Sequence, residues 1–393
     1  LGRALTGMGT ARRGHAELAS LLGSVTGGVH AAPWAAPAGG PDAAERLILR
    51  AKVLAEREGD LEAILRELFF EASFADGERF LQLVLEARTR LEARLVPSGH
   101  QALQHRLTAR LHSAHHAEER FAGLSQYFFL KELETLVRGD WDGVRHTLDD
   151  LRDRLLRQND ALLGITAGGE GVTTARSRFG ALLQELPARG GARQPRTTLA
   201  AAGTELVVLP TRAHFVGLAA DLRRHGATGH GSALVAAKFL RTSWLWERVR
   251  VQGGAYGAFC HYNRKSGALA LLSYRDPNCE KTLETFRGAG AFLRTTSLSR
   301  DEIEKAVIGT IGDIDAHHLP DAKGLASLKR HLSGITDEER QQLRGEVLAT
   351  GKKELRAFGE LLEQALSGGE VAVIGDAALR ERLPGAVVVE PLG

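Results

Sequence analysis

The stretch WLWERVRVQGGAYGAFCHYN, residues 244–263, contains the most informative change of pattern in the chain. Apolar residues at helical spacing run up to Val249, two glycines follow at Gly253 and Gly254, and a strand-like run then continues to Tyr262. Glycine lets a backbone turn tightly or approach another chain closely. We therefore expect a helix over residues 232–249, a turn, and a strand that opens a hairpin.

The surrounding sequence completes a predicted sheet. The apolar run at residues 267–274 follows the polar turn Asn263-Arg264-Lys265-Ser266, which predicts an antiparallel hairpin with residues 254–262. Further strands are expected at residues 205–209, 214–218 and 370–375. Helices fill the interval between the hairpin and the last strand. This order predicts an α+β fold, with helices packed on one face of an antiparallel or mixed sheet.

Helix starts are marked by capping patterns. Ser299-x-x-Glu302 and Thr336-x-x-Glu339 have the spacing of a capping box. Asp276 before Pro277 is expected to cap the helix that follows the hairpin. Ser232, after His230-Gly231, is expected to be an N-cap residue, with a role for His230 in lining a peptide channel as the alternative.

The first half of the chain repeats the plan of a strand followed by helices. Residues 27–34 predict a strand, whereas residues 43–95, rich in Leu, Glu, Arg and Ala, predict helices. Helical periodicity continues over 100–138 and 141–157, and residues 159–167 predict a short buried strand. We expect two similar domains, over residues 1–187 and 204–393. The Pro-, Gly- and Arg-rich segment 188–203 is the predicted linker.

The composition is that of an ordinary globular protein. Lys and Arg total 51 against 48 Asp and Glu, without a long block of one sign, so neither nucleic acid nor a membrane is an expected partner. The two cysteines, Cys260 and Cys279, are too few for a disulfide framework and are expected to be small apolar residues. The first residue is Leu, which suggests that the chain begins inside a longer protein.

Arg250 and Tyr256 are the side chains of the opening stretch that could carry chemistry. If the chain is extended from Val249 onward, every second residue from Arg250 to Tyr256 lies on one face. A permanent cation and a phenol beside Gly253 and Gly254 would suit an extended peptide and a developing oxyanion. The alternative is a Gly-rich turn whose tyrosine packs and whose arginine is solvated. Spacing alone does not decide between them.

Other segments of the chain carry recognisable motifs as well. They are LTGMGTARRGHAELASLLGSVTGG (5–28), PSGHQALQHRL (97–107), GLSQYFFLKEL (123–133), LSYRDPN (272–278), AVIGTIGDIDAHHLPDAKG (306–324) and GITDEERQQLRGEVLAT (334–350). Together with residues 244–263, they resemble the C-terminal half of the presequence-protease family, in the pitrilysin and insulinase class of zinc metallopeptidases. The resemblance extends over nearly the whole chain.

The resemblance implies an active site built from two halves. An N-terminal half would supply an H-x-x-E-H zinc site, and by motif this half would supply Arg250 to anchor the substrate backbone and Tyr256 to hydrogen-bond the carbonyl oxygen. Unstructured peptides, such as cleaved targeting presequences, would be degraded in a closed chamber. The implied compartment is a bacterial cytoplasm or a mitochondrial matrix.

No H-x-x-E-H occurs in the sequence, so zinc is expected in the N-terminal half and this chain alone is expected to be inactive. The most similar pattern, His112-Ser-Ala-His115-His116, lacks the glutamate and favours a polar helix face over a metal site. Two other interpretations stay open. The chain could be a non-catalytic, peptide-binding or structural subunit, like the partners of processing peptidases, or an inert fragment with an exposed apolar face.

Overall fold

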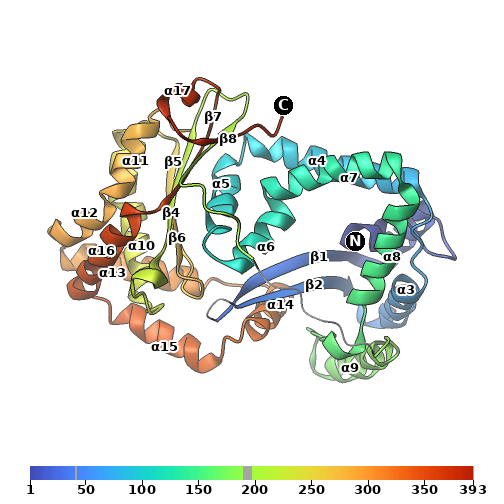
Figure 1. Cartoon of the computed structure of the whole chain (residues 1–393). Coiled ribbons are helices and arrows are strands. Elements are labelled where there is room, and N and C mark those ends of the chain that lie inside the picture. Colours follow the sequence, from blue (N-terminus) through green and yellow to red (C-terminus); the bar gives the residue numbers. More distant parts are fainter. Residues whose placement is uncertain (40–41, 189–196, 393) are drawn as a thin grey trace.

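A computed structural model describes residues 1–39, 42–188 and 197–392. Figure 1 shows a large sheet with its helices on one side of the molecule and a long hairpin surrounded by helices on the other. These parts correspond to the C-terminal and N-terminal halves of the chain. Residues 189–196 of the predicted linker lie outside the described residues.

The large sheet has the strand order β5-β6-β4-β7-β3-β8. β4 runs antiparallel to β6 and β7, β5 runs antiparallel to β6, and β3 runs parallel to β7 and β8. The predicted hairpin and mixed α+β sheet are therefore confirmed. The strands are β3 (Thr204–Val208), β4 (Phe215–Asp221), β5 (Gly257–Tyr262), β6 (Ala268–Tyr274), β7 (Glu370–Gly375) and β8 (Val387–Val389).

One face of this sheet is covered by helices of the same half. Val216 and Leu218 of β4 lie in one buried cluster with Phe286 and Leu362 from the covering helices. A fully buried side chain of this size contributes about 1.5–3 kcal/mol. The helices of this half are α10 (Ser232–Thr242), α11 (Cys279–Arg287), α12 (Ala289–Thr295), α13 (Arg300–Ile314), α14 (Pro320–Leu332), α15 (Asp337–Leu348), α16 (Lys352–Ser367) and α17 (Leu379–Arg382).

The opposite face of the sheet is covered by α5 (Gly99–Thr108), which belongs to the first half of the chain. Leu103 and Leu107 of α5 lie in a buried cluster with Phe215. Two glycines allow this close packing. A Cβ at Gly99 would lie 2.8 Å from the Phe215 ring, and one at Gly217 would lie 2.5 Å from Leu107 Cδ1. The two halves therefore share a hydrophobic core.

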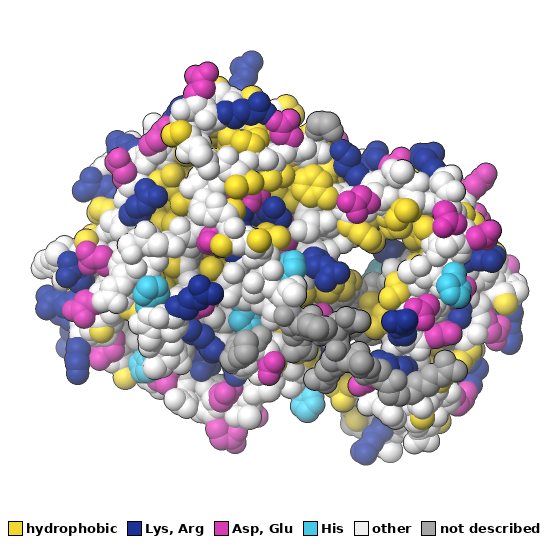
Figure 2. Space-filling model, in the orientation of Figure 1, with side chains coloured by type: hydrophobic (Ala, Val, Ile, Leu, Met, Phe, Trp, Pro, Cys, Tyr) yellow, Lys and Arg dark blue, Asp and Glu magenta, His cyan; other side chains and the backbone are white. Residues whose placement is uncertain are grey.

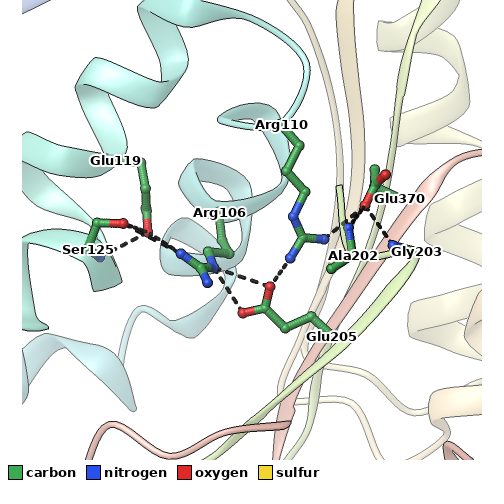
Figure 3. A network of polar contacts seen from close by, with 8 residues as sticks. All are labelled: Arg106, Arg110, Glu119, Ser125, Ala202, Gly203, Glu205 and Glu370. Carbon is green, nitrogen blue, oxygen red and sulfur yellow. Dashed lines mark hydrogen bonds and ion pairs between the residues drawn. The ribbon is translucent and has the colours of Figure 1, made fainter. Parts of the chain in front are cut away.

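A buried ionic network joins the same two halves (Figure 3). Glu205 on β3 is paired with Arg110, and it accepts hydrogen bonds of 2.9 and 3.2 Å from Arg106 Nε at its two carboxylate oxygens. The side chains of Arg110 and Glu205 are each 1% exposed. Glu119 and Glu370 extend the network on either side. Because these charges lie away from water, each depends on its partners for stability.

The first half is built around a two-stranded hairpin. β1 (Thr26–Gly39) confirms the strand predicted at residues 27–34 and pairs antiparallel with β2 (Asp42–Val53). Two buried clusters hold its helices together. The helices are α1 (Gly2–Gly7), α2 (His15–Val25), α3 (Glu58–Phe70), α4 (Gly77–Leu95), α6 (Ser113–Ala122), α7 (Leu124–Gly139), α8 (Trp141–Leu155) and α9 (Gly169–Gln184).

Two predictions for the first half are wrong. Residues 43–53, expected to be helical, form most of β2, because pairing with β1 outweighs the weak helix preference of Leu, Glu, Arg and Ala. Residues 159–167, expected to be a buried strand, contain the end of the short turn η2 (Gln158–Asp160) and then irregular chain. Leu162 there is 51% exposed.

The capping predictions have mixed outcomes. Ser299 and Glu302 form the reciprocal capping box, and the Thr336 side chain accepts a hydrogen bond from Glu339 N. Ser232 is not an N-cap, because that position is Gly231 and the Ser232 hydroxyl lies 2.8 Å from His230 Nδ1. The N-cap of α11 is Asn278 rather than Asp276.

The surface has mixed charge, as expected. Figure 2 shows basic and acidic side chains interspersed over the face that it draws. None of the helices within the described residues is long and apolar enough to cross a membrane.

Both cysteines are buried free thiols. Burial raises the pKa of Cys260 and of Cys279 to about 12, so both stay protonated at neutral pH. We expect a thiol-specific disulfide reagent at pH 8 to react with neither in the folded protein and with both in urea, as measured by release of the chromophore. Rapid labelling of the folded protein would contradict this burial.

Candidate functional site

Arg250 lies in a π-helix and not in the extended segment that the sequence suggested. The helix η4 (Trp246–Val251) follows α10, and Gln252 N donates to Glu247 O over 2.9 Å, which is the five-residue step of a π-turn. Single π-turns occur frequently at functional sites. The alternation proposed for residues 250–256 is therefore wrong for the first part of this segment.

The Arg250 side chain is held by an aromatic ring. Its guanidinium carbon lies 3.9 Å from the centroid of the Trp246 ring, a cation–π contact that fixes the direction of the side chain. Trp246 is itself 48% exposed. No carboxylate of the described residues forms an ion pair with Arg250. The guanidinium donors are thus free to bind an acceptor on another molecule.

Tyr256 follows the turn and presents its hydroxyl to solvent. The residue is 68% exposed, and its ring packs edge-on against Tyr274 with centroids 5.6 Å apart. Its backbone N donates to Tyr274 O over 3.0 Å, so β6 holds it in place. Within the described residues, no hydrogen bond engages the phenol oxygen. A ring fixed on one side with a free hydroxyl is a pre-oriented donor.

Gly253 and Gly254 make the tight turn between these two residues possible. A Cβ at Gly253 would lie 2.5 Å from Val249 O, and Gly254 has a φ of +78°. The turn is then tied to the loop after β6, because Asn278 Nδ2 donates to Gly253 O over 2.5 Å. These glycines therefore have a structural role, whichever contacts they make with a ligand.

The loop after β6 is rigid. Asp276 accepts hydrogen bonds from Asn278 N and Thr282 Oγ1 at 2.8 and 2.7 Å, which ties the start of α11 to the loop although Asp276 is not its N-cap. The neighbouring Arg275 has the unusual φ of +50°, and its guanidinium lies 5.4 Å from the Tyr274 ring centroid. This loop brings a second cation to the ring that supports Tyr256.

His100 was not singled out from the sequence but completes the support of Tyr274. Its ring packs edge-on against Tyr274 and stacks on Phe259, both at 5.0 Å between centroids. Its Nδ1 is buried without a hydrogen-bond partner in the described part of the chain, and burial lowers the pKa of the imidazole. His100 and Tyr274 lie in quoted motifs, but no spacing rule connects residues so far apart in sequence.

His230 lies at the other end of β5. Gly229 O accepts a hydrogen bond from Arg264 Nε in the β5–β6 turn, whereas Tyr256 precedes the first residue of β5. Six strand residues separate these ends, about 20 Å at ~3.3 Å per residue. The structure thus groups Arg250, Gly253, Gly254 and Tyr256 in one place and sets His230 apart from them.

The other histidines have structural partners. His112 is the N-cap of α6 and accepts a hydrogen bond from Ala114 N. His115 Nε2 lies 2.9 Å from Ser266 Oγ, and His116 Nδ1 lies 3.0 Å from Thr197 O. In residues 1–39, 42–188 and 197–392, no group of three or more His, Cys, Asp or Glu could hold a metal ion.

The overall fold is that of the pitrilysin class of peptidases. Pitrilysin itself superimposes with a TM-score of 0.58 at 15% identity, over 93% of this chain and 38% of pitrilysin. The periplasmic protease PqqL from Escherichia coli gives a TM-score of 0.61 at 13% identity, over 98% of this chain and 43% of that protein. At such identities the likeness concerns the fold alone.

Sequence comparisons specify the family. Residues 204–377 match the family described as "PreP C-terminal domain", and residues 1–133 match a second family, described as a peptidase-associated region. Presequence protease 1, chloroplastic/mitochondrial, from Arabidopsis thaliana is 39% identical over 97% of this chain. The chain belongs to the presequence-protease family and corresponds to its C-terminal region. It spans 36% of the length of the Arabidopsis protein.

Proposed function

We propose that this chain is the C-terminal half of a metalloendopeptidase that degrades unstructured peptides, such as cleaved targeting sequences. The observation that carries the proposal is the pair formed by Arg250 and Tyr256, which are pre-oriented by Trp246 and Tyr274 and have no acidic partner or hydrogen-bonded hydroxyl among the described residues. Family membership supports the same conclusion.

Each residue of the pair has a distinct role in this proposal. The Arg250 guanidinium donates hydrogen bonds to a backbone carbonyl of the bound peptide and so fixes its register. The Tyr256 hydroxyl donates to the scissile carbonyl oxygen, and this bond strengthens as the carbon becomes tetrahedral and the oxygen gains negative charge. Arg250 thus contributes to binding, whereas Tyr256 contributes to the transition state.

The residues of this chain do not fit the zinc that the family implies. The sequence lacks H-x-x-E-H, and the described residues contain no group able to hold a metal. We assign zinc to the part of the protein outside this chain, together with the remainder of the chamber wall. The proposed compartment, a bacterial cytoplasm or a mitochondrial matrix, follows from the same substrate class.

A reconstitution experiment tests the proposal. The 393-residue chain, supplied with zinc, is assayed on a quenched fluorescent peptide of about 20 residues, first alone and then mixed with the N-terminal half of the protein. We expect cleavage only in the mixture. Cleavage by the chain alone would place a metal site here and overturn the assignment. Peptide binding by a mixture that never cleaves would favour the non-catalytic subunit instead.

A further inference from the structure

A large cavity lies beside the open edge of β2. It has a volume of about 1970 Å³ and separates β2 from the irregular segment 160–168, with α3, α9 and α14 completing its wall. Apolar side chains line both sides, among them Leu47 and Leu49 from β2 and Leu162 and Leu163 from the facing segment. Figure 2 shows the molecule hollowed between its two halves on the face that it draws.

β2 has the sequence of a strand buried within a sheet, but only one neighbour. Leu47, Ile48 and Leu49 are three consecutive apolar residues, which is typical of strands covered on both faces. All three are only partly buried, and β1 is their one pairing strand in the described chain. By contrast β6, the second strand of the other hairpin, pairs with both β5 and β4 and is buried over residues 268–273.

The two halves have the same order of elements after their hairpins. Six α-helices, α11 to α16, follow the hairpin β5–β6 and lead to β7. Six α-helices, α3 to α8, follow the hairpin β1–β2 and lead to the segment 159–167. In the second half, β4 lies between β6 and β7. The corresponding place in the first half, between β2 and residues 161–167, is the cavity.

We propose that the cavity receives a β-strand from the part of the full-length protein that precedes Leu1, and that this strand pairs with β2. In the second half, β3 and β4 come before α10 and the hairpin, and residues 1–25 contain only α1 and α2 before β1. The Arabidopsis relative is nearly three times as long as the region matched. The inference does not depend on the proposed peptidase activity.

The pairing of β1 with β2 identifies which amides are open to a new strand. Pro33 lies opposite Leu47, and Pro37 lies opposite Ala43. Proline has no N–H to give to a ladder, so these are non-hydrogen-bonded pairs and the backbone groups of Leu47 point away from β1. By the two-residue period, the amides of Leu49 and Ala51 also point to the open edge, whereas those of Ile48 and Arg50 bond to β1.

Hydrogen exchange measured at single-residue resolution tests the proposal. The amides of Leu47, Leu49 and Ala51 should exchange rapidly in the 393-residue chain and about 10²-fold more slowly in the full-length protein. The amides of Ile48 and Arg50 should be protected in both and serve as the internal control. Equal rates at Leu49 in the two proteins would overturn the proposal. So would protection that appears in the short chain only as its concentration rises, because a second copy would then occupy the edge.

A substitution across the cavity provides an independent measurement. Leu162→Asp should shift the thermal midpoint of the 393-residue chain by less than ~2 °C, because Leu162 is half-exposed there, and lower that of the full-length protein by more than ~5 °C. The matched control is Leu136→Asp on α7, which is similarly exposed at 54% and lies outside the cavity wall. Equal shifts for Leu162→Asp in both proteins would contradict the docking of a strand.

Discussion

Replacing Tyr256 with Phe in the full-length protein is expected to lower kcat for peptide cleavage by about 10²–10³-fold with little change in KM, because removing one oxyanion donor costs the transition state and not the ground state. The ring would still pack against Tyr274, which holds it edge-on at 5.6 Å between centroids. Only the exposed hydroxyl is lost. Steady-state kinetics on a fluorogenic peptide measure the effect.

The matched control is Tyr127→Phe. Tyr127 lies on α7 in the first half and is buried at 4% exposure, away from the candidate site. Removing its hydroxyl should leave both kcat and KM unchanged. Near-normal turnover in Tyr256→Phe would refute the proposed role of Tyr256, and a change confined to KM would make the residue a binding contact instead.

The largest loss of stability is expected from Glu205→Gln. Glu205 is 1% exposed and is the shared partner of Arg106 and Arg110, so its neutral replacement leaves positive charges buried with too few counter-charges. Breaking a buried pair in this way typically costs about 3–5 kcal/mol. The urea midpoint of the 393-residue chain, followed by circular dichroism, should fall accordingly.

An exposed carboxylate provides the comparison. Glu304 forms an i−4 ion pair with Arg300, and the two side chains are 53% and 92% exposed. Because solvent and salt screen such a pair, Glu304→Gln should leave the urea midpoint within experimental error. Equal midpoints for the two variants would mean that the Glu205 network contributes little and that the shared apolar core alone joins the two halves.

The sequence was sufficient to predict the second half of the fold. Its hairpin has a polar turn between two apolar runs, and Ser299 with Glu302 has the spacing of a capping box, so local pattern and final structure agree. The position of α5 could not be predicted. Its packing on the far face of the sheet depends on contacts between residues about a hundred positions apart, such as Leu107 with Phe215.

The two wrong predictions in the first half have a common physical cause. β2 is rich in residues that favour helices, and only its pairing with β1 makes it a strand. Residues 159–167 have the apolar character of a strand, but no strand of the described chain lies beside them to pair with. Secondary structure that depends on a distant partner is poorly encoded in a local window.

The candidate site was predicted in part. Arg250, Gly253, Gly254 and Tyr256 were identified from their residue types, but their roles came from the resemblance and remain a proposal. The geometry was misjudged, because a π-turn at Trp246–Val251 has no distinct sequence pattern. Tyr274, Arg275 and His100 were missed as supports because they reach Tyr256 only through the folded sheet.

β7 stands between β4 and β3 in the middle of the large sheet, although it is formed by residues 370–375, near the end of the chain. During synthesis on the ribosome, β4 and β3 are therefore complete long before the strand that connects them has been made. Their facing edges stay unpaired until translation is nearly finished, and such edges are prone to aggregation. Nascent chains that stall shortly before residue 370 should therefore depend strongly on chaperones.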